Sequence, residues 1–217
     1  GPWWSGAVRL ALMAIALVIK HRSGRVRLLG EEIGGLPSRL IARRGVSRTF
    51  QHVKMLPEMS VLENVALGGY LRSHAGILRS VAGLAAEEER RLFREAERQL
   101  ERVGLREQMH EPAGNLALGQ ARLMEIARAL CADPVLLLLD EPAAGLRHQE
   151  KQSLGRVLRQ LKGEGMSLLL VEHDMEFVMD LTDRIVVMEF GTKLMEGTPA
   201  EVQASPQVRA AYLGMEH

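Results

Sequence analysis

The sequence predicts an α/β fold: a mainly parallel sheet flanked by helices, with an inserted helical lobe. The first reason is the alternation of short apolar runs with helical patterns in the C-terminal half of the chain. The second is the run 135–139, which is apolar throughout, as is typical of a strand buried on both faces of a sheet. The third is a long, charged helical stretch with no strand pattern, which is expected to form the lobe.

The first part of the chain is expected to contain two short strands and two short helices. Pro37 is a favourable residue at the start of a helix, and Ser60 followed by Glu63 three positions later forms a capping-box pattern. The expected elements are a strand over 24–29, a helix over 37–44, a strand over 46–51 and a helix over 60–71.

The lobe is expected to contain a surface helix over 87–102 that is dense in charge and docks through one apolar stripe. Gly104 follows it in the position that glycine favours after a helix. The stripe consists of Leu92, Phe93, Ala96, Leu100 and Val103. We expect one domain: core segments 1–69 and 131–217, a helical lobe over 70–130, and an atypical front end over 1–24.

The C-terminal half alternates strictly between helix and strand patterns, which favours parallel strands with helical crossovers. The helices are expected over 120–130, 149–162 and 175–181, and the strands over 135–139, 166–171 and 184–188. In the first of these helices, the apolar spacing turns one face inward: Leu123, Ile126, Ala127 and Leu130.

Composition excludes some function classes. The chain has 217 residues with 25% charged residues and a net charge of +1, so it has no basic excess for binding nucleic acid. The single cysteine, Cys131, cannot form an internal disulfide and is expected to be a buried residue in a reducing compartment. The apolar run 10–19 is too short to span a membrane and is expected to be a buried helix. We therefore expect a soluble, cytoplasmic chain.

Polar residues occur at four places just after strands or just before helices, where an open α/β sheet binds its ligands. They are Gln51, the segment 116–120, the pair Asp140 and Glu141, and the segment 172–174. Adjacent carboxylates at such an edge can hold a cation and activate water. A solvated acidic turn would explain the pair alone, and a structural histidine would explain His173 alone. The four together favour a nucleotide site.

These motifs resemble the ATP-binding subunits of ABC transporters. The similarity covers nearly the whole chain, and finer features are similar to the LivG-type subunit of branched-chain amino acid importers. The segments that carry it are ARRGVSRTFQ, MSVLENV, GQARLMEIARAL, LLLLDEPAAGL, VEHDMEFVMDLTDRIVVMEFGTKLMEGTPAEV and VRAAYLG. The resemblance implies an ABC-type P-loop NTPase fold with ATP and Mg²⁺ as cofactors.

The resemblance also implies roles for individual residues. Asp140 would hold Mg²⁺, with Gln51 reaching toward the metal and the attacking water. Glu141 would act as general base, and His173 would contact the γ-phosphate. A signature segment would face the nucleotide of a second subunit, assisted by Gly145 in the turn after the acids. The signature segment is Leu116, Ala117, Leu118, Gly119 and Gln120.

The sequence departs from the family pattern at three places. Ala117 stands where the family usually has serine, and Arg147 and His148 stand where this branch usually has Asn-Pro. At the phosphate cradle, Gly1 and Gly6 have the expected spacing, but the lysine and the Ser/Thr that follow are replaced by alanine and valine at positions 7 and 8. We therefore expect strongly impaired ATP binding and hydrolysis, from a truncated or misread front end or, less simply, from an evolved pseudo-ATPase.

The implied partners are a second ABC ATPase subunit, as a homodimer or a heterodimer, and transmembrane permease subunits. A periplasmic or extracellular substrate-binding protein would act indirectly. The chain would lie on the inner face of the cell membrane. One rival hypothesis is a non-catalytic subunit that completes the composite site of an intact partner. Another, a DNA-repair ATPase of the same superfamily, would need a very long coiled-coil insert, and the lobe here is short.

Overall fold

The computed structural model describes residues 24–49, 53–72 and 84–213. The chain divides into two compact units, and each is described by itself. One unit contains residues 37–170, and the other contains residues 1–36 and 171–217. The expected division into a core and a lobe over 70–130 stays a prediction. The expected helix over 10–19 lies outside the described residues.

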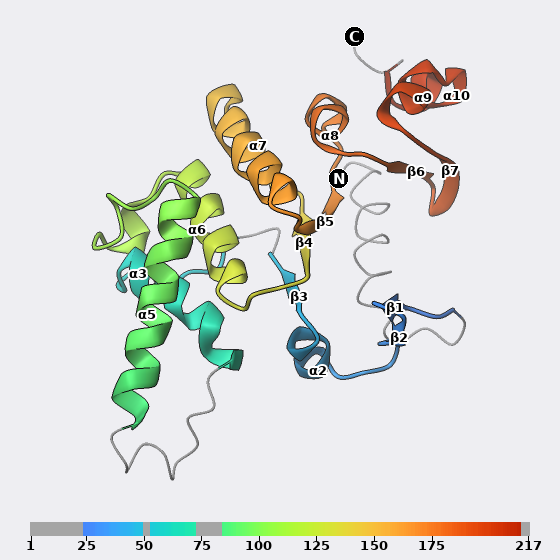
Figure 1. Ribbon diagram of the computed structural model, residues 1–217. Coiled ribbons are helices and arrows are strands. Elements are labelled where there is room, and N and C mark those ends of the chain that lie inside the picture. Colours follow the sequence, from blue (N-terminus) through green and yellow to red (C-terminus); the bar gives the residue numbers. More distant parts are fainter. Residues whose placement is uncertain (1–23, 50–52, 73–83, 214–217) are drawn as a thin grey trace. The chain divides into compact units, whose positions relative to one another are not determined.

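The first unit contains a three-stranded sheet in the order β3-β4-β5 (Figure 1). The strands are β3 (Val46–Arg48), β4 (Leu136–Asp140) and β5 (Ser167–Val171). Strands β3 and β4 are parallel, with Val46 opposite Leu136, so the parallel pairing predicted from the sequence is confirmed here. Leu137 and Leu139 are fully buried, whereas Leu136 and Leu138 are only partly buried. The apolar residues of β4 are therefore more deeply buried on one face of the strand than on the other.

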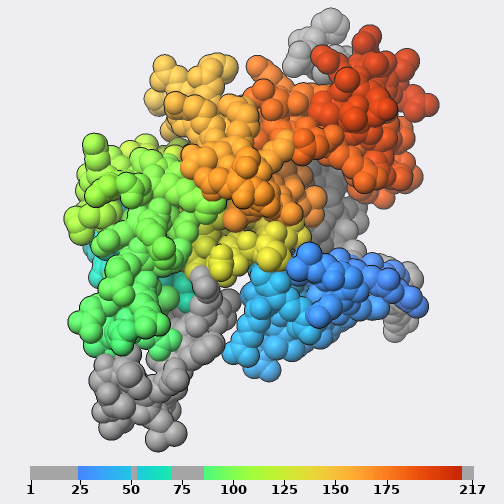
Figure 2. Space-filling model, in the orientation of Figure 1, coloured from blue at the N-terminus to red at the C-terminus, as the bar shows by residue number. Residues whose placement is uncertain are grey.

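Helices pack together to form the rest of this unit; in Figure 2, α2 is blue, α5 green and α7 yellow to orange. They are α2 (Ser38–Arg43), α3 (Val61–Ala66), α5 (Leu84–Arg102), α6 (Leu118–Leu130) and α7 (His148–Gly163), with the 3₁₀ turns η1 (Leu67–Arg72) and η2 (Ala113–Asn115). Helix α3 packs against both α5 and α6. Most of the two predicted inward faces is buried, but Leu92 and Phe93 of the expected stripe are only half-buried. The buried residues are Ala96, Leu100, Val103, Leu123, Ile126, Ala127 and Leu130.

The start of α3 was predicted correctly, but its end was not. Ser60 accepts a hydrogen bond from Glu63 N, and Glu63 accepts one from Ser60 N, as in a capping box. The α-helix then ends at Ala66, before the expected residue 71, and the chain continues as the tighter turn η1. Gly68 in that turn lies against the backbone of Arg128, an approach that no other residue type permits.

The second unit contains two antiparallel hairpins, which the alternation pattern did not predict. They are formed by β1 (Arg27–Leu28) with β2 (Glu31–Glu32) and by β6 (Ile185–Glu189) with β7 (Thr192–Gly197). Phe190 and Gly191 join β6 to β7, both with positive φ (47° and 79°), as a two-residue hairpin turn requires. The unit also contains α8 (Met175–Leu181), α9 (Pro199–Ala204), α10 (Pro206–Val208) and a π-helical turn, η3 (Arg209–Leu213).

Among the helices of the described ranges, none combines the length and the apolar character that crossing a membrane requires.

Candidate functional site

The end of β4 places two carboxylates side by side in a sharp turn. Asp140 is the last residue of the strand and is 3% exposed, and Glu141 follows it at 6%. Glu141 has a φ of 44°, in the left-handed region that non-glycine residues rarely adopt. Its carbonyl oxygen accepts a hydrogen bond from Ala144 N at 3.1 Å, which closes the turn. Two buried acids on a strained backbone are typical of a functional site rather than of a solvated loop.

Asp140 forms an ion pair with Arg48 on the neighbouring strand. Arg48 Nη2 donates to Asp140 Oδ2 at 3.1 Å. The parallel register explains the contact: Arg48 lies opposite Leu138, two residues before the acid. Burial raises the pKa of the Asp140 carboxyl, while the Arg48 hydrogen bond and positive charge oppose that rise. Arg48 therefore partly offsets the cost of burying this carboxylate.

The second oxygen of Asp140 fits a metal or a metal-bound water. Asp140 Oδ1 is buried and has no hydrogen-bond partner within the described residues, and the same holds for Thr49 Oγ1. A buried polar atom is costly unless it has a partner, and a metal ion, a water molecule or a residue outside the described ranges can supply one. Within the described ranges, no group of three or more His, Cys, Asp or Glu side chains gathers to hold a metal. A single carboxylate suits Mg²⁺, which binds one or two carboxylates and keeps water and phosphate as its other ligands.

The signature segment forms the turn into α6. Ala117 is the residue before the helix, and its N–H donates to the Gln120 side chain at 3.1 Å. Because alanine has no side-chain acceptor, the helix start lacks the capping bond that serine would give. Gly119 N donates to Glu150 Oε1 at 3.2 Å. Gly145 lies against Leu118, because a Cβ at position 145 would come within 3.3 Å of Leu118 Cδ2.

Glu150 links the signature segment to the turn that follows the acids. Its second oxygen accepts a hydrogen bond from Arg147 N at 2.8 Å, at the start of α7. A Cβ added at Gly119 would lie 2.8 to 3.0 Å from atoms of Glu150. The glycine is therefore needed for contact with Glu150 as well as for any approach of a phosphate.

His173 belongs to the other unit and comes two residues after the end of β5 along the chain. Its side chain is 47% exposed and lies 3.7 Å from the buried carboxylate of Glu172, measured between His173 Nδ1 and Glu172 Oε2. Asp174 begins α8 by accepting a hydrogen bond from Phe177 N at 3.1 Å. The segment 172–174 thus has the predicted position between a strand and a helix.

Comparison with known proteins identifies the family. The pattern of the ABC transporter family matches residues 10–144, and that of the branched-chain amino acid ATP-binding cassette transporters matches residues 192–217. The chain belongs to the ABC transporter family. Within it, the chain is similar to the high-affinity branched-chain amino acid transport ATP-binding protein BraF of Pseudomonas aeruginosa. They are 42% identical over 194 residues, covering 88% of this chain and 76% of BraF.

LivG of Escherichia coli K12, a protein of the same description, is 40% identical over 200 residues, covering 90% of this chain and 78% of LivG. Among solved structures, the fold is similar to the ADP conformation of MJ1267, an ATP-binding cassette of an ABC transporter. The TM-score is 0.79 at 29% identity, covering 94% of this chain and 84% of MJ1267. The chain is therefore an ABC transporter ATP-binding subunit of the LivG type, and the α/β fold inferred from its motifs is confirmed.

Not every residue assigned from the ABC motifs can be placed. Asp140, Glu141, the signature segment and Gly145 lie in one unit, and His173 lies in the other. Gln51, Gly1 and Gly6 lie outside the described residues. Sequence reasoning missed Arg48 and Glu150, the two side chains that bind Asp140 and Gly119. Arg48 lies on the strand expected over 46–51, but no sequence pattern sets the register that brings it beside Asp140. No sequence pattern indicates the contact of Glu150 either.

Proposed function

We propose that this chain is the ATP-binding subunit of an importer for branched-chain or similar amino acids, and that its own ATP hydrolysis is strongly impaired. The observation that carries the proposal is the pair of buried carboxylates at the end of β4. The chain's relatives BraF and LivG are described as branched-chain amino acid transport ATP-binding proteins, and this supports branched-chain amino acids as the substrate class.

In this proposal, the residues act on the terminal phosphate of ATP. Glu141 accepts a proton from the attacking water, and Gln51 and His173 orient that water and the γ-phosphate. Asp140 would hold Mg²⁺, which supplies positive charge at the phosphate oxygens when it is bound. Arg48 keeps the Asp140 carboxylate in place at 3.1 Å. The fit of Mg²⁺ rests on the buried Asp140 Oδ1, which has no hydrogen-bond partner within the described residues.

The signature segment and Gly145 act on the nucleotide of a second subunit. The N–H groups at the start of α6 and the positive end of that helix suit a phosphate. The second subunit is another ABC ATPase, either a copy of this chain or a different subunit. BraG of Pseudomonas aeruginosa, a transport ATP-binding protein 33% identical over 94% of this chain, is an example of a second subunit type. The pair binds transmembrane permease subunits at the inner face of the membrane, and a substrate-binding protein delivers the amino acid.

The impairment follows from the phosphate cradle. The family pattern places lysine and Ser/Thr directly after the second glycine, where this chain has Ala7 and Val8. The lysine neutralises the β- and γ-phosphate oxygens, and the hydroxyl binds the metal. When the lysine and the hydroxyl are both absent, the negative charge that develops on the phosphate oxygens lacks two stabilising partners. We therefore infer weak nucleotide binding and slow turnover.

The test compares the purified chain with the double variant Ala7→Lys, Val8→Thr in nucleotide binding and ATP turnover. We expect the double variant to bind Mg-ATP tighter and to hydrolyse it at least tenfold faster. Adding Glu141→Gln to the double variant should leave binding intact and remove turnover, because glutamine cannot accept the proton. Equal turnover by the original chain and the double variant would refute the impairment. Absence of nucleotide binding by both would refute the proposed function.

A further inference from the structure

Residues 53–59, which precede α3, form neither helix nor strand, yet several of their backbone polar groups form hydrogen bonds. A backbone N–H or C=O without a partner is costly away from water, so such a segment needs other donors and acceptors. Side chains from neighbouring helices bind the peptide groups of Lys54 and Leu56.

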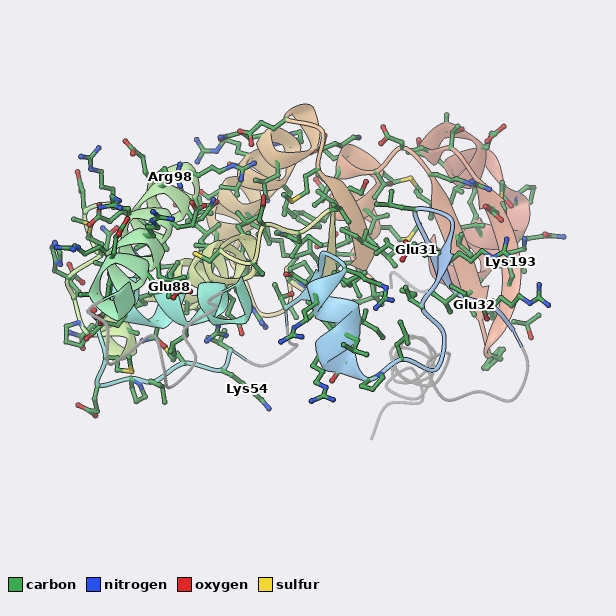
Figure 3. All side chains as sticks on the ribbon, turned by 60° about the horizontal axis from the view of Figure 1, so that its bottom comes forward. Glu31, Glu32, Lys54, Glu88, Arg98 and Lys193 are labelled. Carbon is green, nitrogen blue, oxygen red and sulfur yellow. The ribbon has the colours of Figure 1, made fainter. Side chains whose placement is uncertain are left out.

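The backbone of Lys54 is held at both ends by helix α6. Lys54 N donates to Glu125 Oε1 at 3.1 Å, and Arg128 Nη1 donates to Lys54 O at 2.5 Å. Glu125 and Arg128 are three residues apart and therefore share one face of the helix. The Lys54 side chain is exposed and projects outward in Figure 3. The helix thus holds the main chain at this point, independently of the side chain.

Burying a glutamate at position 125 lowers stability, so a glutamate is expected there only if its contact with the Lys54 backbone is needed. Glu125 is 2% exposed, on a helix whose buried positions are otherwise mostly apolar. Arg122 and Arg128 each approach it at 3.4 Å, which is a long distance for a charge-assisted hydrogen bond. A buried ionic group is seldom the most stable choice, because an apolar side chain of similar volume avoids the loss of hydration. Its shortest hydrogen bond, at 3.1 Å, is the one to Lys54 N.

A second side chain repeats the arrangement two residues later. Asn64 of α3 is fully buried, and its side-chain oxygen accepts a hydrogen bond from Leu56 N at 2.9 Å. Its side-chain nitrogen donates to Leu56 O at 2.9 Å. The peptide groups of Lys54 and Leu56 are thus each bound through both N–H and C=O. This gives the segment two separate attachments, one to α6 and one to α3.

We propose that Glu125 and Arg128 are positioning residues that attach the segment following Gln51 to the helix that begins with the signature segment. Gly119 and Glu125 are six residues apart on α6, about 9 Å along the helix axis. Lys54 follows Gln51 by three residues. A shift of the chain at Lys54 would therefore be transferred to α6 through the side chains of Glu125 and Arg128. The functional consequence rests on the proposed function, whereas the attachment itself does not.

The attachment is tested by site-resolved amide hydrogen exchange of the chain without nucleotide. Glu125→Ala removes the acceptor for Lys54 N, and we expect exchange of that amide to rise about tenfold or more. Glu125→Gln keeps a side-chain oxygen and should restore most of the protection. Asn64→Ala is the matched control, since it should release the Leu56 amide and leave Lys54 protected. Unchanged exchange at Lys54 in Glu125→Ala, or equal changes at both amides in both variants, would overturn the proposal.

The functional consequence has its own measurement in the background of the Ala7→Lys, Val8→Thr variant. Glu125→Ala should lower kcat for ATP several-fold and change KM little, because nucleotide contacts stay while the two segments lose their alignment. Glu125→Gln should recover kcat. A rise in KM at unchanged kcat would contradict the positioning role. If that background shows no turnover, the proposed function fails, and the exchange experiment still decides whether Glu125 holds Lys54.

Discussion

Glu125 is the residue at which burial and charge conflict most clearly in the described part of the chain. Burial raises the pKa of its carboxyl above the ordinary value of 4.5. The Lys54 N–H and the positive charges of Arg122 and Arg128 oppose that rise without cancelling it. The protonated form is therefore favoured more in the folded chain than in the unfolded chain.

This shift predicts a pH-dependent difference between the chain and Glu125→Gln. Because the folded pKa is raised, the contribution of Glu125 to the free energy of unfolding is fully present below the unfolded pKa and is lost as pH rises through the folded pKa. Glutamine does not titrate. The chain should therefore gain stability relative to Glu125→Gln as pH falls from about 7 to about 4.5. Urea unfolding of both proteins across this range measures the difference, and an opposite slope would contradict it.

The chain must be compared with Glu125→Gln because other carboxyls have a lowered pKa and change stability with pH in the opposite direction. Glu63 and Glu201 each accept hydrogen bonds from a capping residue, and this lowers the pKa of both carboxyls. Their contribution to the free energy of unfolding is present above the unfolded pKa and is lost as pH falls through the folded pKa. Both groups are unchanged in Glu125→Gln, so their effect cancels in the difference.

At the scale of single residues, the sequence predicted the acids but not the side chains that bind Asp140 and Lys54. The apolar run before Asp140 and Glu141 predicted a strand buried on both faces and ending in two carboxylates; the strand and the buried acids are confirmed, but Leu136 and Leu138 are only partly buried. The contact of Arg48 with Asp140 depends on the register between β3 and β4. The contact of Glu125 with Lys54 depends on how residues 53–59 pass along helix α6. Neither arrangement leaves a periodic signal in the sequence.

At the scale of elements, the close packing of η1 on α6 rests on Gly68. A Cβ at this position would lie 1.8 Å from the backbone oxygen of Arg128 and 2.7 Å from its carbonyl carbon. Backbone atoms inside a helix cannot move aside cheaply. Gly68→Ala should therefore lower the free energy of unfolding by about 3 kcal/mol. Urea denaturation measures it.

The matched control is Gly163→Ala, at the end of α7. No atom lies within 4 Å of a Cβ added there. Alanine is favoured over glycine in helices, so this variant should be unchanged or up to about 1 kcal/mol more stable. A loss of similar size in both variants would show that the effect at position 68 comes from the loss of a glycine and not from the contact with Arg128.

Elements with a strong hydrophobic period were predicted best. Helices α5, α6, α7 and α8 lie within a few residues of the expected ranges, because each repeats apolar residues on one face. Strand β7 was missed because its sequence, TKLMEG, lacks alternation and pairs through the turn at Phe190 and Gly191. The early end of α3 was missed because it depends on the contact of Gly68 with α6.

At the scale of the whole molecule, ligand binding should raise stability only where the phosphate cradle is complete. A ligand that binds the folded state alone, at 100 times its Kd, adds about 2.7 kcal/mol to the free energy of unfolding. For a chain of this size, that gain corresponds to a rise in Tm of about 5 to 10 °C. We expect this rise with Mg-ATP for the Ala7→Lys, Val8→Thr variant and a much smaller one for the original chain.

A thermal unfolding series over nucleotide concentration distinguishes binding from hydrolysis. The Ala7→Lys, Val8→Thr variant with Glu141→Gln added should show the same rise in Tm, because Glu141 acts on water and not on nucleotide affinity. Asp140→Asn in the same background should reduce the rise with Mg-ATP more than the rise with ATP and a chelator, since only the first requires a metal ligand. Equal shifts in the original chain and the Ala7→Lys, Val8→Thr variant would mean that the lysine and threonine contribute nothing to binding, and that the phosphates are held by other residues.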